Sequence, residues 1–103
     1  SGGVNIYPAE IEAALEQHPD IYEAAVFGVP DEEWGESVHA VVVRRPGSEL
    51  DDAAVRAHAR QHLAGDTIPR TLTWLDELPK TGSGKILKRE LRQPFWADRT
   101  SNV

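Results

Sequence analysis

Residues Ile21–Arg44 have the sequence IYEAAVFGVPDEEWGESVHAVVVR. Two parts of this stretch, 21–28 and 38–44, are rich in Val, Ala and aromatic residues, which is typical of β-strands. The segment Pro30–Glu36 between them is polar, so it predicts a connecting loop. We therefore predict two strands joined by a loop, and because His39 alternates with its apolar neighbours we expect its side chain to face solvent.

A helix is predicted before these strands. Pro8 suits the first helical position, and two glutamates follow it near the positive end of the helix dipole. Residues at helical spacing continue to Pro19, which stops the run; they are Ile11, Ala14, Leu15 and His18. The residues before this helix, Val4–Tyr7, predict a short extended or hairpin segment.

A second helix is predicted after the strands. Pro46-Gly47 indicates a turn, and Asp51 or Asp52 can cap the helix that follows. One side of this helix contains Val55, Ala59, His62 and Leu63. Gly65 is placed where a helix commonly ends, so we expect the helix to end there.

The last predicted elements are a third strand and a third helix. Thr71–Leu75 has strand composition, and Leu87 and Leu91 have the four-residue spacing of a short helix that Pro94 closes. The predicted fold class is α+β, with a small three-stranded sheet flanked by two to three helices.

Composition limits the kind of protein. The chain has 103 residues, of which 40% are hydrophobic and 27% charged, as in one ordinary globular domain. It contains no cysteine, which excludes a disulfide framework, a thiolate nucleophile and a zinc ribbon. We recognise no membrane span or signal peptide and take the cytoplasm as the default location. Because the sequence begins Ser1-Gly2-Gly3 and lacks methionine, we expect it to be part of a longer protein.

Charge is unevenly distributed along the chain. Residues 80–103 contain six basic and two acidic side chains, whereas residues 1–79 contain five and fifteen. A basic tail on an acidic body favours contact with anions or an acidic partner. A solvated helix face remains an equal alternative for Lys88, Arg89 and Arg92. We expect no nucleic-acid binding, because the acidic body repels phosphates and the aromatic residues do not alternate with the basic ones.

The loop Pro79–Lys85 is the strongest functional candidate from the residues alone. It resembles a nucleotide-binding P-loop, but that motif needs glycine at the position of Pro79 and Ser or Thr at the position of Ile86. What remains is Lys85 on a flexible backbone, suited to neutralising phosphate or carboxylate oxygens. The alternative interpretation is an ordinary surface lysine after a turn.

Other polar residues give weaker signals. His58 and His62 are spaced like a metal pair on a helix, but Ala59 stands where a zincin has its glutamate, and we expect structural histidines. The carboxylates of 31–36 do not have EF-hand spacing. Ser83 has no partner histidine within sequence range. We therefore predict no metal site and no hydrolase.

Three motifs resemble those of one protein family. Ser1–Glu12 resembles the opening motif of the C-terminal domain of adenylate-forming enzymes, which include acyl-CoA synthetases, luciferases and adenylation domains of peptide synthetases. Gly28–Asp31 together with Trp34–Glu36 is similar to the next motif, and Pro79–Ile86 is similar to the last. We interpret residues 1–103 as the mobile C-terminal domain of such an enzyme, with a large N-terminal domain as its partner.

The resemblance implies a two-step ligase reaction. A small-molecule carboxylate attacks the α-phosphate of ATP, giving an acyl-adenylate and pyrophosphate, and the thiol of CoA then takes the acyl group and releases AMP. Lys85 matches the family lysine that enters the active site for the first step. After the domain rotates, the Gly2-Gly3 turn is expected to face the pantetheine arm, where small residues let the backbone pass closely.

The resemblance also implies where the other parts of the site lie. Mg²⁺ is expected to be bound mainly by the N-terminal domain, and the isolated chain is expected to be inactive. Lys88 and Arg89 are candidate anion contacts. Asp66 and Thr67 depart from the pattern, because many relatives have tyrosine and lysine in that segment, and a phosphate or interdomain contact there is not carried over.

Within the superfamily the sequence favours one branch. Asn5–Pro8 and Lys85–Leu91 are most similar to acyl-CoA synthetases, the ligases of fatty acid metabolism. Two alternatives remain: an adenylation domain that loads a carrier protein, and a non-catalytic binding or regulatory module.

Overall fold

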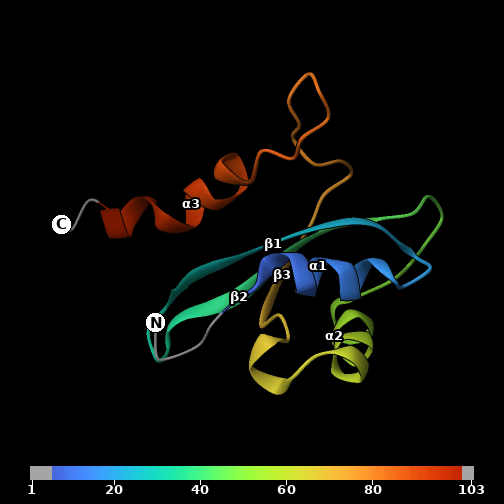
Figure 1. Cartoon of the computed structure of the whole chain (residues 1–103), viewed down its shortest axis with the longest axis horizontal. Coiled ribbons are helices and arrows are strands. Elements are labelled where there is room, and N and C mark those ends of the chain that lie inside the picture. Colours follow the sequence, from blue (N-terminus) through green and yellow to red (C-terminus); the bar gives the residue numbers. More distant parts are fainter. Residues whose placement is uncertain (1–5, 101–103) are drawn as a thin grey trace.

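The computed structural model describes residues 6–100 and contains three helices, one short 3₁₀ helix and a three-stranded sheet within them (Figure 1). In chain order the elements are α1 (Pro8–Glu16), β1 (Ile21–Asp31), β2 (Gly35–Arg44), α2 (Asp52–His62), η1 (Gly65–Thr67), β3 (Thr71–Trp74) and α3 (Lys88–Thr100). The predicted α+β class is confirmed. Val4 and Asn5 of the predicted N-terminal segment lie outside the described residues.

The sheet has the order β1-β2-β3. β1 and β2 are antiparallel, whereas β3 runs parallel to β2 and pairs Thr71–Trp74 with His39–Val42. A parallel pair needs a long crossover connection, and α2 with η1 provides it. The sheet therefore combines a hairpin with one crossover.

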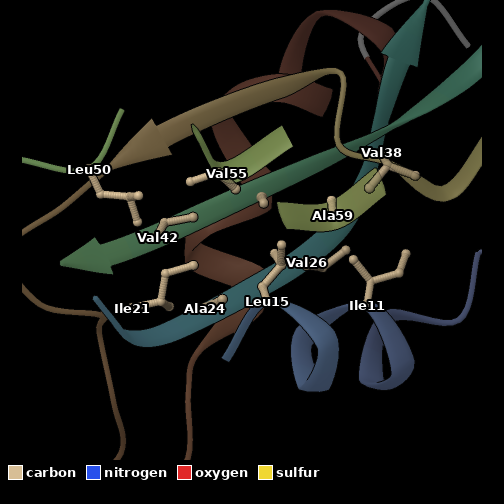
Figure 2. Packing of buried hydrophobic residues seen from close by; sticks show 11 residues of the cluster. Ile11, Leu15, Ile21, Ala24, Val26, Val38, Val42, Leu50, Val55 and Ala59 are labelled. Atoms are coloured by element: carbon tan, nitrogen blue, oxygen red, sulfur yellow. The ribbon is translucent and has the colours of Figure 1, made fainter. Parts of the chain in front are cut away.

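Two apolar clusters cover the two faces of the sheet. On one face, α1 and α2 pack against alternate residues of β1 and β2. Figure 2 shows Leu15 of α1 and Val55 of α2, both fully buried, gathered with Val26 of β1 and Val42 of β2. The opposite face packs against the hairpin that precedes α3 and against the first turns of α3 itself; its members are Ala25, Phe27, Val29, Val41, Val43 and Leu78, with Ile86 and Leu91 beside them.

The connection between β1 and β2 is shorter than predicted. The strands extend to Asp31 and Gly35 and leave only residues 32–34 in the turn. Asp31 accepts hydrogen bonds from the amides of Glu33 and Trp34, at 2.9 Å each, and the Trp34 bond in particular lowers the pKa of its carboxyl. Gly35 has a φ of 82°, which favours glycine. These features close a tight turn where the sequence predicted a longer loop.

Both predicted helix ends in the C-terminal half are wrong. Asp51 caps α2 as expected by accepting from the Ala54 amide at 2.9 Å, but the helix ends at His62 because Leu63 is already extended. Gly65 instead begins η1. Pro94 lies inside α3 and has no N–H to donate to the carbonyl of Glu90, four residues earlier, but Glu90 is exposed, so water can bond to that carbonyl.

The free edge of β1 is covered by side chains. Glu16 and Glu12 of α1 accept hydrogen bonds from the amides of Ala24 and Val26, at 3.1 and 2.8 Å. Further along, Trp96 of α3 donates to the carbonyl of Gly28 at 2.9 Å. An uncovered edge strand invites pairing with other chains, and these three bonds occupy it.

Candidate functional site

Residues 79–87 form a small hairpin between β3 and α3, and in Figure 1 it projects away from the sheet. Lys80 and Ile86 pair as an antiparallel bridge, and the Leu87 amide donates to the Pro79 carbonyl at 2.8 Å. Nearer the tip, the Thr81 amide donates to the Lys85 carbonyl at 2.8 Å. The hairpin therefore has a regular stem.

The tip of the hairpin is held by its own polar atoms. The Gly84 amide donates to the Thr81 carbonyl at 2.9 Å, and the Lys85 amide donates to the Thr81 hydroxyl at 3.1 Å. The Ser83 and Thr81 hydroxyls lie 3.0 Å apart. Gly84 has a φ of 91°, which favours glycine there, whereas Gly82 has no positive φ. Hydrogen bonds among its own atoms therefore give the tip a defined turn.

Lys85 extends from this tip into solvent. Its side chain is exposed, and within residues 6–97 no carboxylate forms an ion pair with its ammonium group. The two neighbouring lysines differ. Lys80 pairs with Glu23 at 3.0 Å, a hydrogen bond that raises the pKa of Lys80, and Lys88 pairs with Glu12 at 2.6 Å.

The other predicted site residues lie apart from Lys85 or outside the description. Gly2 and Gly3 lie outside the described residues. Arg89 is exposed on α3, whereas the charge of Lys88 is already paired. Asp66, in η1, borders a hollow of about 270 Å³ that Trp34 also lines.

His58 and His62 of α2 lie next to each other, and His58 contacts α1. His58 donates through Nε2 to the carbonyl of Ala14 at 2.7 Å and so joins α2 to α1, and its ring lies 4.6 Å from that of His62. The described part of the chain has no group of three potential metal ligands.

His39 is buried, contrary to the prediction. It is only 2% exposed, because α3 covers the second face of the sheet, where the ring of Phe95 lies 4.5 Å away. Its two ring nitrogens contact the hydroxyls of Thr71 and Thr73 at 2.6 and 2.8 Å, and burial lowers its pKa. Local alternation indicates which face of the sheet His39 is on but not what covers that face.

Comparison with known proteins identifies the family of the chain. The family model of the AMP-binding enzyme C-terminal domain matches residues 10–85. The chain belongs to this family. The resemblance indicated by the three sequence motifs is therefore confirmed, and Lys85 is the last residue of the matched region.

Curated relatives of the chain include ligases. A fatty acid–[acyl-carrier-protein] ligase, ScoC from Streptomyces coeruleorubidus, is 46% identical over 101 residues, which is 98% of this chain and 20% of the relative. A feruloyl-CoA synthase from an Amycolatopsis species is 50% identical over 95 residues, or 92% of this chain and 19% of the relative. The chain thus spans about a fifth of the length of these relatives.

Solved structures agree with this assignment. Apo MatB from Rhodopseudomonas palustris is 40% identical with a TM-score of 0.86, and the match covers 91% of this chain and 19% of MatB. A Mycobacterium tuberculosis fatty acyl CoA synthetase is 38% identical with a TM-score of 0.85, covering 95% and 19%. No helix among the described residues is long and apolar enough to cross a membrane.

Proposed function

We propose that this chain is the mobile C-terminal domain of an ATP-dependent acid–CoA ligase and that Lys85 is its catalytic residue for adenylate formation. The main support is that the ammonium of Lys85 is exposed and, among the described residues, forms no ion pair, on a hairpin whose stem is held by regular backbone hydrogen bonds. The family membership and the acid–CoA ligases among the relatives support the reaction class. The substrates are ATP, CoA and a carboxylic acid.

The chemical role of Lys85 is electrostatic. A carboxylate and the α-phosphate of ATP repel each other, and a cation placed between their oxygens offsets that repulsion and stabilises the charge that develops in the transition state. A lysine ammonium is a compact cation with three donors, so it can contact both groups. An N-terminal domain of the same protein is the partner that supplies the pocket.

We assign no Mg²⁺ site to this domain. The described residues contain no cluster of ligands for it, so the N-terminal domain would hold any Mg²⁺ that accompanies ATP. For thioester formation we assign the Gly2-Gly3 turn to the pantetheine arm after the domain rotates. Arg89 is exposed and forms no ion pair among the described residues, so it can contact an anionic group, whereas the charge of Lys88 is already paired with Glu12.

The test is a substitution in the full-length protein. We expect Lys85→Ala to reduce pyrophosphate release by about 10²- to 10³-fold, as for loss of one preorganised transition-state contact. Thioester formation from supplied acyl-adenylate should stay within about twofold, since that step uses another face of the domain. Arg60→Ala, which removes an exposed cation from α2, is the matched control. An equal loss in both half-reactions would contradict the assignment.

A second acceptor is favoured by one relative. ScoC is a fatty acid–[acyl-carrier-protein] ligase, and its match covers 98% of this chain. Carrier protein in place of CoA is therefore the alternative for the second step. Supplying each acceptor to preformed acyl-adenylate distinguishes the two. In either case the 103-residue chain alone should release no pyrophosphate, and sustained release would refute the division between two domains.

A further inference from the structure

We propose that two ion pairs fix the stem of the Lys85 hairpin to β1, which makes Lys80, Glu23, Lys88 and Glu12 positioning residues for Lys85. This inference rests on the proposed function for its catalytic meaning. The hairpin-to-β1 contact itself is a property of this chain and can be tested without activity.

The first pair holds the incoming side of the stem. Lys80 lies in the stem opposite Ile86, and its ammonium is 3.0 Å from the carboxylate of Glu23 in β1. The side chains are 35% and 15% exposed, so water reaches the pair but does not surround it. Glu23 faces the second side of the sheet, as Ala25 and Phe27 do, beneath the hairpin.

The second pair holds the outgoing side. Lys88 begins α3 directly after the stem, and its ammonium is 2.6 Å from the carboxylate of Glu12. The same carboxylate oxygen accepts the Val26 amide at 2.8 Å, which fixes it to the edge of β1. Because Glu12 is thus held by the strand, Lys88 is positioned relative to β1 although Glu12 belongs to α1.

Both sides of the stem are therefore held to β1, and apolar side chains pack between the two ion pairs. Leu78, buried to 4% exposure, precedes the stem, and Ile86 and Leu91 pack against the cluster that it belongs to. The tip lies beyond these contacts, so the position of Lys85 relative to the sheet depends on the stem. A misplacement of about 1 Å can cost a reaction about 10²-fold, which gives this restraint a catalytic purpose.

The pairs also select which lysine is free. Three lysines lie within or next to the hairpin, and the carboxylates of Glu23 and Glu12 occupy two of them. Lys85 is the one left without a counter-charge among the described residues. A substrate anion that approaches the hairpin therefore meets an unpaired cation at the tip.

Amide hydrogen exchange of the 103-residue chain tests the restraint directly. Lys80→Met and Lys88→Met remove the charge and keep most of the aliphatic side chain. Each should speed exchange of the Gly84, Lys85 and Leu87 amides about two- to fivefold, the range for a partly exposed ion pair, and the double variant about tenfold. The amides of β2 should stay within about twofold. Unchanged exchange at the hairpin in the double variant would overturn the proposal.

A charge reversal separates pairing from other effects of substitution. Glu23→Lys combined with Lys80→Glu restores an ion pair and should return hairpin exchange toward the wild-type rate, whereas either single reversal should accelerate it. Raising salt to about 0.5 M should speed hairpin exchange in the wild type but not in the Lys80→Met/Lys88→Met variant, because screening weakens exposed pairs. A double reversal that exchanges as fast as the single ones contradicts a pairing role.

Half-reactions of the full-length protein connect the restraint to Lys85. The double Met variant should lower adenylate formation about tenfold and leave thioester formation within about twofold, and Arg60→Met on α2 is the matched control. If Lys85→Ala leaves adenylate formation intact, the proposed function is wrong, and the hydrogen-exchange experiment still tests whether the ion pairs hold the hairpin. If Lys85→Ala abolishes it while the double Met variant matches the wild type in rate and exchange, the positioning role fails alone.

Discussion

Substitution of Glu12 tests how the structure holds the edge of β1. One oxygen of this carboxylate accepts the Val26 amide at 2.8 Å and lies 2.6 Å from the ammonium of Lys88. Glu12→Gln keeps an oxygen that can accept the amide but removes the charge. Glu12→Ala removes both. The two variants therefore separate the hydrogen bond from the ion pair.

The expected losses follow from exposure. The Lys88 and Glu12 side chains are 34% and 20% exposed, so we expect Glu12→Gln to lower the free energy of unfolding by about 0.5–1 kcal/mol. Val26 is fully buried, and an unpaired amide there costs about 1–3 kcal/mol. Because water can reach the strand edge once the side chain is short, we take the lower part of that range. Glu12→Ala should then cost about 2 kcal/mol in total, or about 10 °C in Tm.

Urea and thermal denaturation of the chain measure both variants. Gln17→Ala, an exposed uncharged position at the end of the same helix, is the matched control and should change stability by less than about 0.5 kcal/mol. Equal losses for Gln and Ala would show that the Val26 hydrogen bond contributes nothing. No loss in either variant would refute the role of α1 in covering the edge of β1.

Two further predictions concern the hairpin and the buried histidine. Gly84→Ala should destabilise the hairpin by about 1–2 kcal/mol, because the φ of 91° at Gly84 strains any residue with a Cβ. Amide exchange of Lys85 should then be faster in Gly84→Ala, whereas Gly82→Ala should have little effect. Equal exchange rates in the two variants would contradict this prediction. Burial lowers the pKa of His39, so His39 binds a proton more readily in the unfolded chain than in the folded one. The stability that neutral His39 contributes is therefore present above about pH 6.5 and is lost as pH falls through the lowered pKa. Urea midpoints between about pH 5 and pH 7 should therefore depend less on pH in His39→Gln, and an unchanged dependence would contradict the assignment.

Much of the fold follows from short-range patterns. The Val-rich runs around Val26 and Val42 predicted the two long strands, and Pro8 and Asp51 marked the starts of two helices. Each of these signals depends on backbone preferences or on the spacing of neighbouring residues. Gly65 shows the limit, since the same residue type is compatible with a helix end and with the start of η1.

Features that depend on contacts between distant segments could not be predicted. His39 was expected in solvent because alternation identifies a face of the sheet, and only the packing of α3 makes that face a buried one. Pro94 was expected to end α3. The helix continues through it because Glu90, whose carbonyl loses its helical partner, is exposed to water. Lys85 could be identified from its glycine-rich neighbours, but the charges that hold its hairpin are separated from it along the chain.

The basic tail acquires a more specific meaning from these contacts. Net charge alone suggested that the tail as a whole attracts anions, yet Lys80 and Lys88 are already neutralised by the acidic body. A nearby counter-ion cancels part of the electrostatic potential of a cation, whereas an unpaired cation can attract a substrate anion with its full charge. The acidic body and the basic tail are thus complementary at the stem of the hairpin. That complementarity leaves the unpaired charge at Lys85, where the proposed adenylation step requires it.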